Sequence, residues 1–318
     1  MRTIALGSHG LSVPVVGLGC MGMSDFYGAS DMKENLKVLD RAHELGCTFW
    51  DTADIYGPFR NEALLGQALT GRRETITLAT KFGIQRDASG AWLGVSGHPD
   101  YVKACCEASL KRLSTDYIDL YYQHRADPDV PVEDTVGAMA ELVVEGKVKY
   151  LGLSEADSET LQRANKVHPI SAMQTEYSLW SREVEEDILP TCQQLGTGFV
   201  AYSPLGRGFL TGAIRQRKDL QDGDWRLDNP RFQEVALQYN GALLEEIDRI
   251  AVSKNITNAQ VALAWLLARK PDIVMIPGTR KVHYLEQNWH AMDINLSSEE
   301  LNSLNQFSSD FIAMGERY

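Results

Sequence analysis

Residues suited to acid–base chemistry stand at the end of a short apolar run, Phe-Trp-Asp-Thr-Ala-Asp-Ile-Tyr-Gly, at residues 49–57. Asp51 and Tyr56 are five positions apart, where a buried strand would give way to a loop. Many α/β folds place their chemistry at strand ends, because the strand is rigid and the loop faces the ligand. Taken alone, the same residues also fit an aspartate turn beside a half-buried tyrosine.

Two more polar residues end apolar runs further along the chain. Lys81 closes residues 76–81, and His124 follows residues 117–123. A lysine is costly to bury without a partner, and Asp51 on the neighbouring strand could supply one. Each residue has a structural explanation, since Lys81 could extend to solvent, His124 could be a hydrogen-bonded core histidine, and Tyr56 could serve packing. Together, at the ends of three consecutive predicted strands, the four indicate an active site.

The chemistry of these four side chains is coherent. A tyrosine with the reference pKa near 10 is a poor acid at neutral pH. A neighbouring ammonium favours the phenolate and lowers that pKa, while an aspartate holds the ammonium charged and in place. A histidine within hydrogen-bond reach could orient a carbonyl oxygen. The set suits protonation of an oxyanion as hydride arrives at carbon, and the reverse in alcohol oxidation.

The elements that must position these residues alternate between strand-like and helical patterns. Such alternation favours βα units and a parallel sheet, and eight strands favour a closed (β/α)8 TIM barrel. An N-terminal β-hairpin is expected within residues 3–16, and extra C-terminal helices at 234–253, 258–269 and 297–308. No linker composition divides the chain, so we expect a single domain over residues 1–318. The predicted barrel strands are 15–19, 48–51, 76–81, 117–123, 148–154, 170–174, 198–203 and 273–277.

Two long interruptions and one misleading motif accompany this pattern. Residues 83–99 and 206–232 follow the third and seventh strands, where long loops are usually lids or binding loops above a barrel's active site. Residues 17–22, Gly-Leu-Gly-Cys-Met-Gly, match the dinucleotide fingerprint letter for letter. That fingerprint requires a helix to open at once, but here a loop follows and the helical pattern begins only near Asp31. We therefore reject a Rossmann interpretation.

Composition narrows the function classes. The 318 residues carry 43 acidic and 31 basic side chains, a net charge of −12, which argues against nucleic-acid binding. No apolar run approaches the roughly 20 residues of a membrane span, and the first residues lack the apolar core of a secretory signal. Five scattered cysteines fit free thiols in the cytoplasm and supply no metal framework.

Several segments resemble the signatures of the aldo-keto reductase superfamily. They are residues 49–57, 79–82 (Ala-Thr-Lys-Phe), 120–124 (Leu-Tyr-Tyr-Gln-His), 152–154 (Gly-Leu-Ser), 174–178 (Gln-Thr-Glu-Tyr-Ser), 202–208 (Tyr-Ser-Pro-Leu-Gly-Arg-Gly), 276–280 (Ile-Pro-Gly-Thr-Arg) and 285–288 (Leu-Glu-Gln-Asn). They occur in order over nearly the whole chain, and look closest to the bacterial and plant branch with short C-terminal tails. The resemblance implies a TIM barrel that transfers hydride between NADP(H) and a carbonyl or alcohol.

Carried over position by position, the resemblance implies Tyr56 as proton donor, Lys81 and Asp51 as the pair that tunes it, and His124 as the group that orients the carbonyl. Ser154 and Gln174 would bind the nicotinamide carboxamide, and Tyr202 would stack on the ring. Ser203, Leu205, Gly206 and Arg207 would hold the pyrophosphate. The implied cofactor set is Gly19, Cys20, Met21, Asp51, Ser154, Gln174, Tyr202, Ser203, Pro204, Leu205, Gly206, Arg207, Gly208, Ile276, Pro277, Gly278, Thr279, Arg280, Gln287 and Asn288. The expected substrate pocket comprises Met21, Phe26, Tyr27, Trp92, His124 and Trp225.

One departure bears on the cofactor. Many family members carry Lys where Gly278 stands and Arg where Tyr284 stands, both near the 2′-phosphate. Arg280 and Lys281 remain to supply charge, so NADPH is the expected cofactor and NADH a possible one.

Two other functions stay open from the sequence. One is a cofactor-binding auxiliary subunit of a membrane channel, which often has an N-terminal extension, whereas this chain begins directly at the predicted hairpin. The other is an isomerase or aldolase that uses Lys81 as a Schiff base. The expected partners are a small carbonyl or alcohol substrate, no nucleic acid and no membrane, in a monomer or homo-oligomer.

Overall fold

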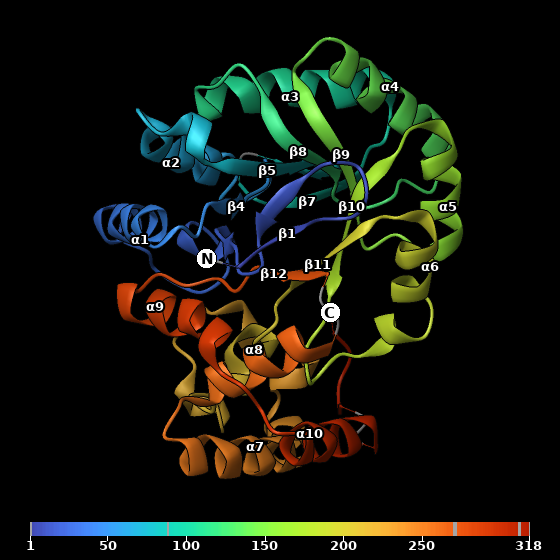
Figure 1. The fold of residues 1–318 in the computed structure, drawn as a ribbon. Helices are drawn as coiled ribbons and strands as arrows, with labels where there is room; N and C mark the ends of the chain where they lie inside the picture. Colours follow the sequence, from blue (N-terminus) through green and yellow to red (C-terminus); the bar gives the residue numbers. More distant parts are fainter. Residues whose placement is uncertain (1, 88, 270–271, 311–312, 318) are drawn as a thin grey trace.

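Eight parallel strands form the central sheet of the protein. The computed structural model describes residues 2–87, 89–269, 272–310 and 313–317. The strand order is β12-β11-β10-β9-β8-β5-β4-β3, so each strand neighbours the next strand of this sheet along the chain (Figure 1). The strands are β3 (Leu18–Gly19), β4 (Phe49–Asp51), β5 (Thr77–Phe82), β8 (Ile118–Gln123), β9 (Val148–Ser154), β10 (Ile170–Glu176), β11 (Gly198–Tyr202) and β12 (Ile273–Met275).

The first and last strands meet and close the sheet into a barrel. Gly17 N–H donates to the Met275 carbonyl at 2.8 Å, and Met275 N–H donates to the Val15 carbonyl at 3.0 Å. Gly19 and Gly278 form a parallel bridge further along the same seam. A Cβ on Gly19 would lie 2.7 Å from the Ile276 carbonyl oxygen, so this close approach of two backbones requires glycine. The predicted (β/α)8 barrel is confirmed.

The predicted hairpin covers the end of the barrel at which the strands begin. β1 (Thr3–Ala5) pairs antiparallel with β2 (Ser12–Pro14). Leu6, Leu11 and Val13 of this hairpin are buried in one cluster with residues that face the barrel interior, such as Phe49 and Leu120. Because the hairpin fills that end, the opposite, carboxyl-terminal end is left to carry a site.

Helices α1 to α6 cover the outside of the sheet, and their ends follow ordinary capping rules. The helices are α1 (Met32–Leu45), α2 (Arg60–Leu69), α3 (Pro99–Leu113), α4 (Val132–Val144), α5 (Ser158–Val167) and α6 (Ile188–Leu195). Asp31 caps α1 by accepting from Lys33 N–H at 2.7 Å, and Gly46 ends it with a left-handed φ of 85°.

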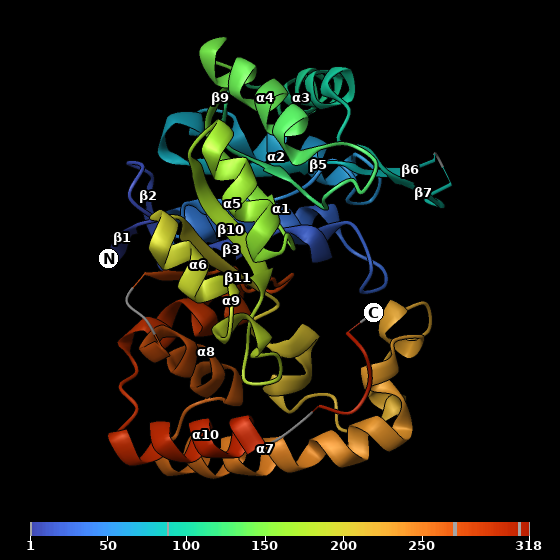
Figure 2. The same ribbon diagram turned by 90° about the vertical axis from the view of Figure 1, so that its right-hand side faces the viewer.

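The C-terminal third adds helices α7 (Glu234–Lys254), α8 (Asn258–Arg269), α9 (Val282–His290) and α10 (Ser298–Asp310). In both ribbon views α7 and α10 lie side by side, away from the strands (Figures 1 and 2). The last helix begins with a reciprocal cap, since Glu300 accepts from Ser297 N–H and Ser297 Oγ accepts from Glu300 N–H.

The two long interruptions, residues 83–99 and 206–232, both contain short regular elements. Residues 83–99 contain an antiparallel hairpin, β6 (Ile84–Arg86) with β7 (Trp92–Val95), which projects from the barrel (Figure 2). Residues 206–232 fold into four short 3₁₀ turns: η4 (Gly206–Thr211), η5 (Arg217–Asp219), η6 (Trp225–Leu227) and η7 (Pro230–Phe232). Both segments follow strand ends, as expected for loops above the carboxyl-terminal face.

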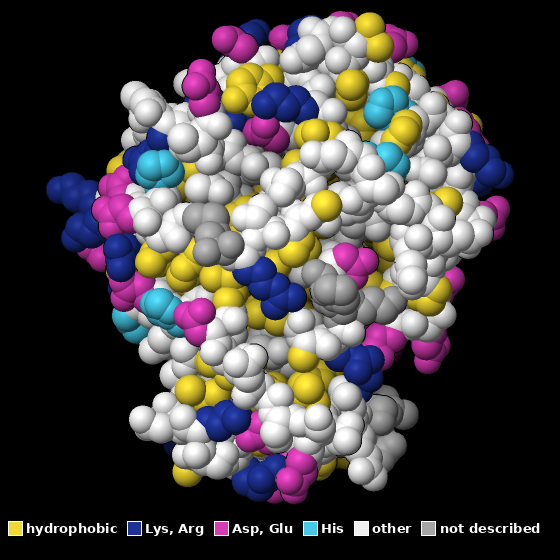
Figure 3. Space-filling view, viewed as in Figure 1, with side chains coloured by type: hydrophobic (Ala, Val, Ile, Leu, Met, Phe, Trp, Pro, Cys, Tyr) yellow, Lys and Arg dark blue, Asp and Glu magenta, His cyan; other side chains and the backbone are white. Residues whose placement is uncertain are grey.

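The features that the composition bears on are the charge of the surface, the character of the helices and the state of the cysteines. On the face drawn in Figure 3, acidic and basic side chains are interspersed, with hydrophobic side chains between them. None of the helices in the described part of the chain has the length and apolar character needed to cross a membrane. Among the described residues none of the five cysteines forms a disulfide, and four of the five are buried.

Candidate active site

The four residues singled out from the sequence converge at the carboxyl-terminal ends of neighbouring strands. Asp51 ends β4, Lys81 is the penultimate residue of β5, and His124 directly follows β8. Tyr56 lies in the loop after β4, held by its N–H bond to the Ala53 carbonyl at 3.2 Å. All four are buried: Lys81 has no exposed surface and the others expose 7% or less.

Lys81 is the centre of this group. Its ammonium donates to Asp51 Oδ1 at 2.5 Å, to the Thr52 carbonyl at 2.8 Å and to the Tyr56 hydroxyl at 3.5 Å. An ammonium has three protons, so these three bonds use all of them. Burial lowers the pKa of Lys81, and the adjacent Asp51 carboxylate opposes that shift. The charged form is the one that this cage of oxygen atoms stabilises.

His124 faces Tyr56 and is neutral at ordinary pH. The two rings lie edge to face, with centroids 5.8 Å apart and an interplanar angle of 85°. Burial holds the pKa of His124 well below its usual range, and the Lys81 and Arg125 cations lower it further. Among the described residues, buried Nδ1 of His124 has no hydrogen-bond partner. A neutral imidazole carries one N–H, which a carbonyl oxygen could accept.

The residues expected to hold the nicotinamide end the next strands. Ser154 is the last residue of β9, Gln174 lies near the end of β10, and Tyr202 is the last residue of β11. Gln174 Nε2 donates to Asp51 Oδ2 at 2.8 Å across the barrel, so it joins the group around Lys81. Arg125 Nη1 donates to Ser154 Oγ at 3.4 Å. The three therefore lie on the same rim as the four reactive side chains.

The segment expected to hold the pyrophosphate has an unusual backbone. Ser203, Gly206, Arg207 and Gly208 all have positive φ, between 47° and 94°. A Cβ on Gly206 would lie 2.7 Å from Trp180 Cε3, so this turn needs glycine for space as well as for conformation. Such turns expose backbone N–H groups that suit an anion. The remaining members of the segment, Pro204 and Leu205, connect β11 to η4.

The side chain of Arg207 has a protein partner. It forms a bidentate pair with Glu176, with nitrogen–oxygen distances of 3.1 and 2.8 Å. Glu176 is fully buried at the end of β10. Burial raises the pKa of Glu176, and the Arg207, Arg317 and Arg231 cations oppose that rise. Arg207 is thus held at the rim by an ion pair that its sequence neighbours do not reveal.

The residues after β12 occupy the seam of the barrel. A Cβ on Gly278 would lie 3.0 Å from the Gly19 carbonyl oxygen, which gives a packing reason for glycine at this position. The Arg280 guanidinium donates to the carbonyls of Tyr27, Gly28 and Ala29 at 2.9, 3.3 and 2.7 Å. Ile276 and Pro277 precede Gly278, Thr279 follows it, and Gln287 and Asn288 lie in α9, with Asn288 buried.

Cys20 and Met21 lie at the opposite side of this seam. Cys20 N–H donates to the Asp51 carbonyl at 2.9 Å, which places this segment beside β4. Burial raises the pKa of the Cys20 thiol, so it stays protonated. Met21 begins the short turn η1 (Met21–Met23) and is half-buried.

The expected pocket residues fall into two groups. Trp225 N–H donates to the Phe26 carbonyl at 3.2 Å, and the two rings are edge to face with centroids 6.2 Å apart. Tyr27 pairs with Asp224 in an antiparallel bridge, so the loop after β3 and the long loop after β11 touch. Trp92, by contrast, lies on the β6–β7 hairpin and is 61% exposed. Its role in a pocket stays a prediction.

Sequence reasoning missed several charged residues around this rim. Arg125 follows His124 directly and donates to the His124 carbonyl at 2.7 Å, so its position beside the histidine was an available signal. Glu176 lies two residues after Gln174, and alternation along β10 gave no reason to single it out. Asp25 and Arg86 form an ion pair of 2.6 Å between the loop after β3 and the β6–β7 hairpin, for which the sequence offers no signal.

Asp54, the second carboxylate of the opening run, is a buried acid beside another acid. It exposes 3% of its surface, and its Oδ1 has no hydrogen-bond partner among the described residues. Burial, with the Glu62 carboxylate, raises the pKa of Asp54 to about 8, while Arg112 and contacts with Ile55 N–H and Cys105 oppose the rise. Asp54 is therefore largely protonated at neutral pH.

This shift predicts a pH-dependent stability. Between pH values of about 4 and 8 the folded chain binds a proton at Asp54 that the unfolded chain does not. Stability from this group is therefore greatest at acidic pH and falls by about 1.4 kcal/mol per pH unit as pH rises through that window. We expect Asp54→Asn to reduce the dependence of the free energy of unfolding on pH and to be more stable than wild type at pH 8. Urea unfolding from pH 5 to 8 measures this free energy, and exposed Asp40→Asn is the control. A dependence on pH in Asp54→Asn as steep as that of wild type would contradict the prediction.

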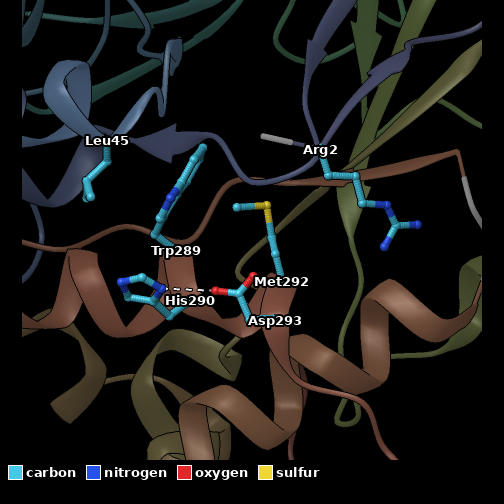
Figure 4. A pocket seen from close by; sticks show the side chains of 6 residues that line it. All are labelled: Arg2, Leu45, Trp289, His290, Met292 and Asp293. Atoms are coloured by element: carbon cyan, nitrogen blue, oxygen red, sulfur yellow. Dashed lines mark hydrogen bonds and ion pairs between the residues drawn. The ribbon is translucent and has the colours of Figure 1, made fainter.

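A separate pocket lies at the other end of the barrel. Leu45 ends α1 just before β4 begins, which places this pocket at the amino-terminal ends of the strands. It contains none of the predicted site residues, and His290 pairs with Asp293 at 3.1 Å on its wall (Figure 4). Its volume is about 460 Å³, and its lining is Arg2, Leu45, Trp289, His290, Met292 and Asp293.

Comparison with known proteins places this arrangement in a family. The sequence model of the Aldo/keto reductase family matches residues 15–309. A thermostable aldo-keto reductase, Tm1743, solved with the inhibitor epalrestat, is 33% identical over 96% of this chain and 99% of its own, with a TM-score of 0.77. An aldo/keto reductase from Klebsiella pneumoniae, solved with NADP and acetate, is 30% identical over 99% of both chains, with a TM-score of 0.75.

A third solved structure agrees in length and in fold. The holo form of the aldo-keto reductase AKR11C1 from Bacillus halodurans is 29% identical over 98% of both chains, with a TM-score of 0.80. The family match covers all eight barrel strands and each of the four convergent residues. The chain therefore belongs to the aldo/keto reductase family of oxidoreductases.

Proposed function

We propose that this protein interconverts aldehydes or ketones and alcohols with NADP(H), and that Tyr56 transfers the proton. The observation that carries the proposal is the buried Lys81 ammonium, which bonds Asp51 at 2.5 Å and the Tyr56 hydroxyl at 3.5 Å. A fixed cation beside a phenol stabilises the phenolate that remains once the proton has left. Asp51 keeps the cation charged and oriented.

The residues at the rim fit a nicotinamide dinucleotide. In the left-handed turn at residues 203–208, the N–H groups of Gly206 and Gly208 bond the Ser203 and Leu205 carbonyls at 2.8 and 3.0 Å, so a pyrophosphate would meet the other backbone N–H groups of the turn and the Arg207 cation. Ser154 and Gln174 supply a hydroxyl and an amide for a carboxamide, and half-buried Tyr202 supplies a ring to stack on. When bound, such a cofactor supplies the hydride. The preference for NADPH is supported by Arg280 and Lys281, and by the Klebsiella pneumoniae relative solved with NADP.

The chain's own residues divide the remaining work. His124, neutral because of burial and two nearby cations, donates one hydrogen bond and so can orient a carbonyl oxygen toward Tyr56. Tyr56 gives its proton to that oxygen as negative charge develops, and takes it back in alcohol oxidation. The surrounding burial excludes water, which strengthens each of these electrostatic contacts.

The Schiff-base alternative fits the geometry poorly. A Schiff base needs a neutral amine with a free lone pair. Lys81 is fully buried, and its three protons are directed at Asp51, Thr52 and Tyr56. We expect borohydride to trap no substrate adduct on Lys81.

A cofactor and substrate panel tests the proposal. The purified chain is mixed with NADPH or NADH and a series of aldehydes and ketones, and with NADP+ or NAD+ and the matching alcohols. We expect saturable NADPH consumption with at least one carbonyl class, and weaker use of NADH. Tight NADPH binding without consumption in any mixture would instead favour the auxiliary-subunit function.

A further inference from the structure

The carboxylate of Asp25 contacts the peptide bond next to the proposed proton donor. Its Oδ2 accepts from Gly57 N–H at 3.0 Å, and Gly57 directly follows Tyr56. Its Oδ1 accepts from Phe26 N–H at 3.1 Å, which fixes the carboxylate within its own loop. The loop after β3 thus holds the Tyr56–Gly57 peptide from the outside.

The fit between these two loops leaves no spare room. Gly57 has a φ of 64°, and a Cβ on it would lie 2.8 Å from the Ser24 carbonyl oxygen. Only glycine allows the backbone after Tyr56 to approach the loop that carries Asp25 so closely. A change in Asp25 is therefore transmitted directly to the Tyr56–Gly57 segment.

Arg86 completes the arrangement from a third segment. Its Nη1 donates to Asp25 Oδ2 at 2.6 Å and to the Ile55 carbonyl at 3.3 Å, and its Nε donates to the Gly90 carbonyl at 2.7 Å. The Arg86 and Asp25 side chains are only 18% and 16% exposed, so water screens the pair weakly. One ion pair joins the loops after β3 and β4 to the β6–β7 hairpin.

We propose that Asp25, held by Arg86, is a positioning residue that sets the orientation of Tyr56 for proton transfer. This inference rests on the proposed function, in which Tyr56 supplies the proton. The Tyr56 hydroxyl is 3.5 Å from Lys81 Nζ, at the long end of hydrogen-bond range. A small rotation of the Tyr56–Gly57 peptide would therefore separate the phenol from the cation that assists it. Proton transfer is sensitive to displacements of this size.

The test compares Asp25→Ala with a matched control. Asp119 also accepts a backbone N–H, from Leu78 at 3.0 Å, and an arginine, Arg73 at 2.7 Å. It lies near the start of β8, at the opposite end of the barrel from His124. We expect Asp25→Ala to lower kcat about tenfold or more while the Kd for NADPH stays within twofold. We expect Asp119→Ala to lower thermal stability but to leave kcat within twofold.

Two conservative variants and one independent measurement sharpen the result. Asp25→Asn keeps an oxygen for Gly57 N–H but loses the charge that holds Arg86, so it should retain more activity than Asp25→Ala. Arg86→Lys should likewise be intermediate, because it keeps the charge and loses the second and third contacts. Hydrogen exchange in the free protein should speed up in peptides that cover residues 55–59 in Asp25→Ala and not in Asp119→Ala.

The outcomes separate this inference from the proposed function. If wild type reduces carbonyls and Tyr56→Phe does not, but Asp25→Ala keeps kcat within twofold, the positioning role is overturned and the function stands. A fall in kcat that only tracks lost thermal stability, as judged against Asp119→Ala, also overturns it. If wild type consumes NADPH with no carbonyl, the proposed function and this inference fall together.

Discussion

Lys81→Met is expected to lower kcat by about 100- to 10,000-fold, the usual contribution of a positioned acid–base group, with NADPH affinity little changed. The substitution keeps the length of the side chain but removes the charge beside the Tyr56 hydroxyl, 3.5 Å away. Tyr56 then has no cation to stabilise the phenolate. Steady-state turnover and NADPH binding, measured on the same preparation, check both halves of the prediction.

The control for this variant addresses stability. Removing Lys81 leaves Asp51, which is 3% exposed, without its ion-pair partner, and an uncompensated buried charge is destabilising. The double variant with Asp51→Asn removes the leftover charge and keeps an amide beside Gln174. We expect it to recover much of the lost stability and none of the turnover. Recovery of turnover would show that the single variant failed through unfolding.

Arg207→Ala is expected to lower the free energy of unfolding by about 3–5 kcal/mol at neutral pH, the range for breaking a buried ion pair. It leaves the Glu176 carboxylate, which is fully buried, without the bidentate partner at 2.8 and 3.1 Å. Arg317 at 3.9 Å compensates only in part. The loss should shrink at acidic pH, because burial raises the pKa of Glu176 and protonation removes the uncompensated charge.

Urea unfolding of three variants tests this prediction. The double variant of Glu176→Gln with Arg207→Met carries no buried charge and should lie closer to wild type than Arg207→Ala does. Arg249→Ala is the surface control, because Arg249 is 59% exposed in its pair with Glu246, and it should change stability by less than about 1 kcal/mol. Equal losses of unfolding free energy in Arg207→Ala and Arg249→Ala would show that the buried pair stabilises the protein no more than an exposed pair does.

The barrel and its four convergent residues could be predicted because their signals are local. Each strand of a covered parallel sheet is a short apolar run, and β9 matches its predicted bounds while β4 and β8 begin one residue later than predicted. Asp51, Lys81 and His124 are visible as polar residues at the ends of such runs. Consecutive parallel strands then bring those ends together. Helix ends such as Gly46 follow from the same local rules.

The partners of these residues could not be predicted, because they lie far away along the chain. Gln174 bonds Asp51 across 123 positions, and Arg86 bonds Asp25 across 61. Such pairs depend on which side chains face each other once the barrel has closed, and single-sequence patterns carry no information on that. Arg207 illustrates the point, since its motif indicated a phosphate contact and its buried partner Glu176 emerged only from the fold.

The long loops were the hardest segments to interpret. Residues 83–99 are predicted as a long loop above the active site, whereas the structure has the β6–β7 hairpin there. Backbone pairing in a hairpin needs little from its side chains, so composition predicted it poorly. The pairing of Tyr27 with Asp224 joins two loops whose contact no local pattern announces.

The most direct test of the account is a single-turnover measurement on Tyr56→Phe. A complex of NADPH with excess protein is mixed with a carbonyl substrate that wild type reduces, and the loss of bound NADPH is followed with time. Phenylalanine keeps the ring against His124 and removes only the hydroxyl beside Lys81. We expect a rate at least about 100-fold lower than wild type with an unchanged Kd for NADPH. A rate within tenfold of wild type would contradict Tyr56 as the proton donor.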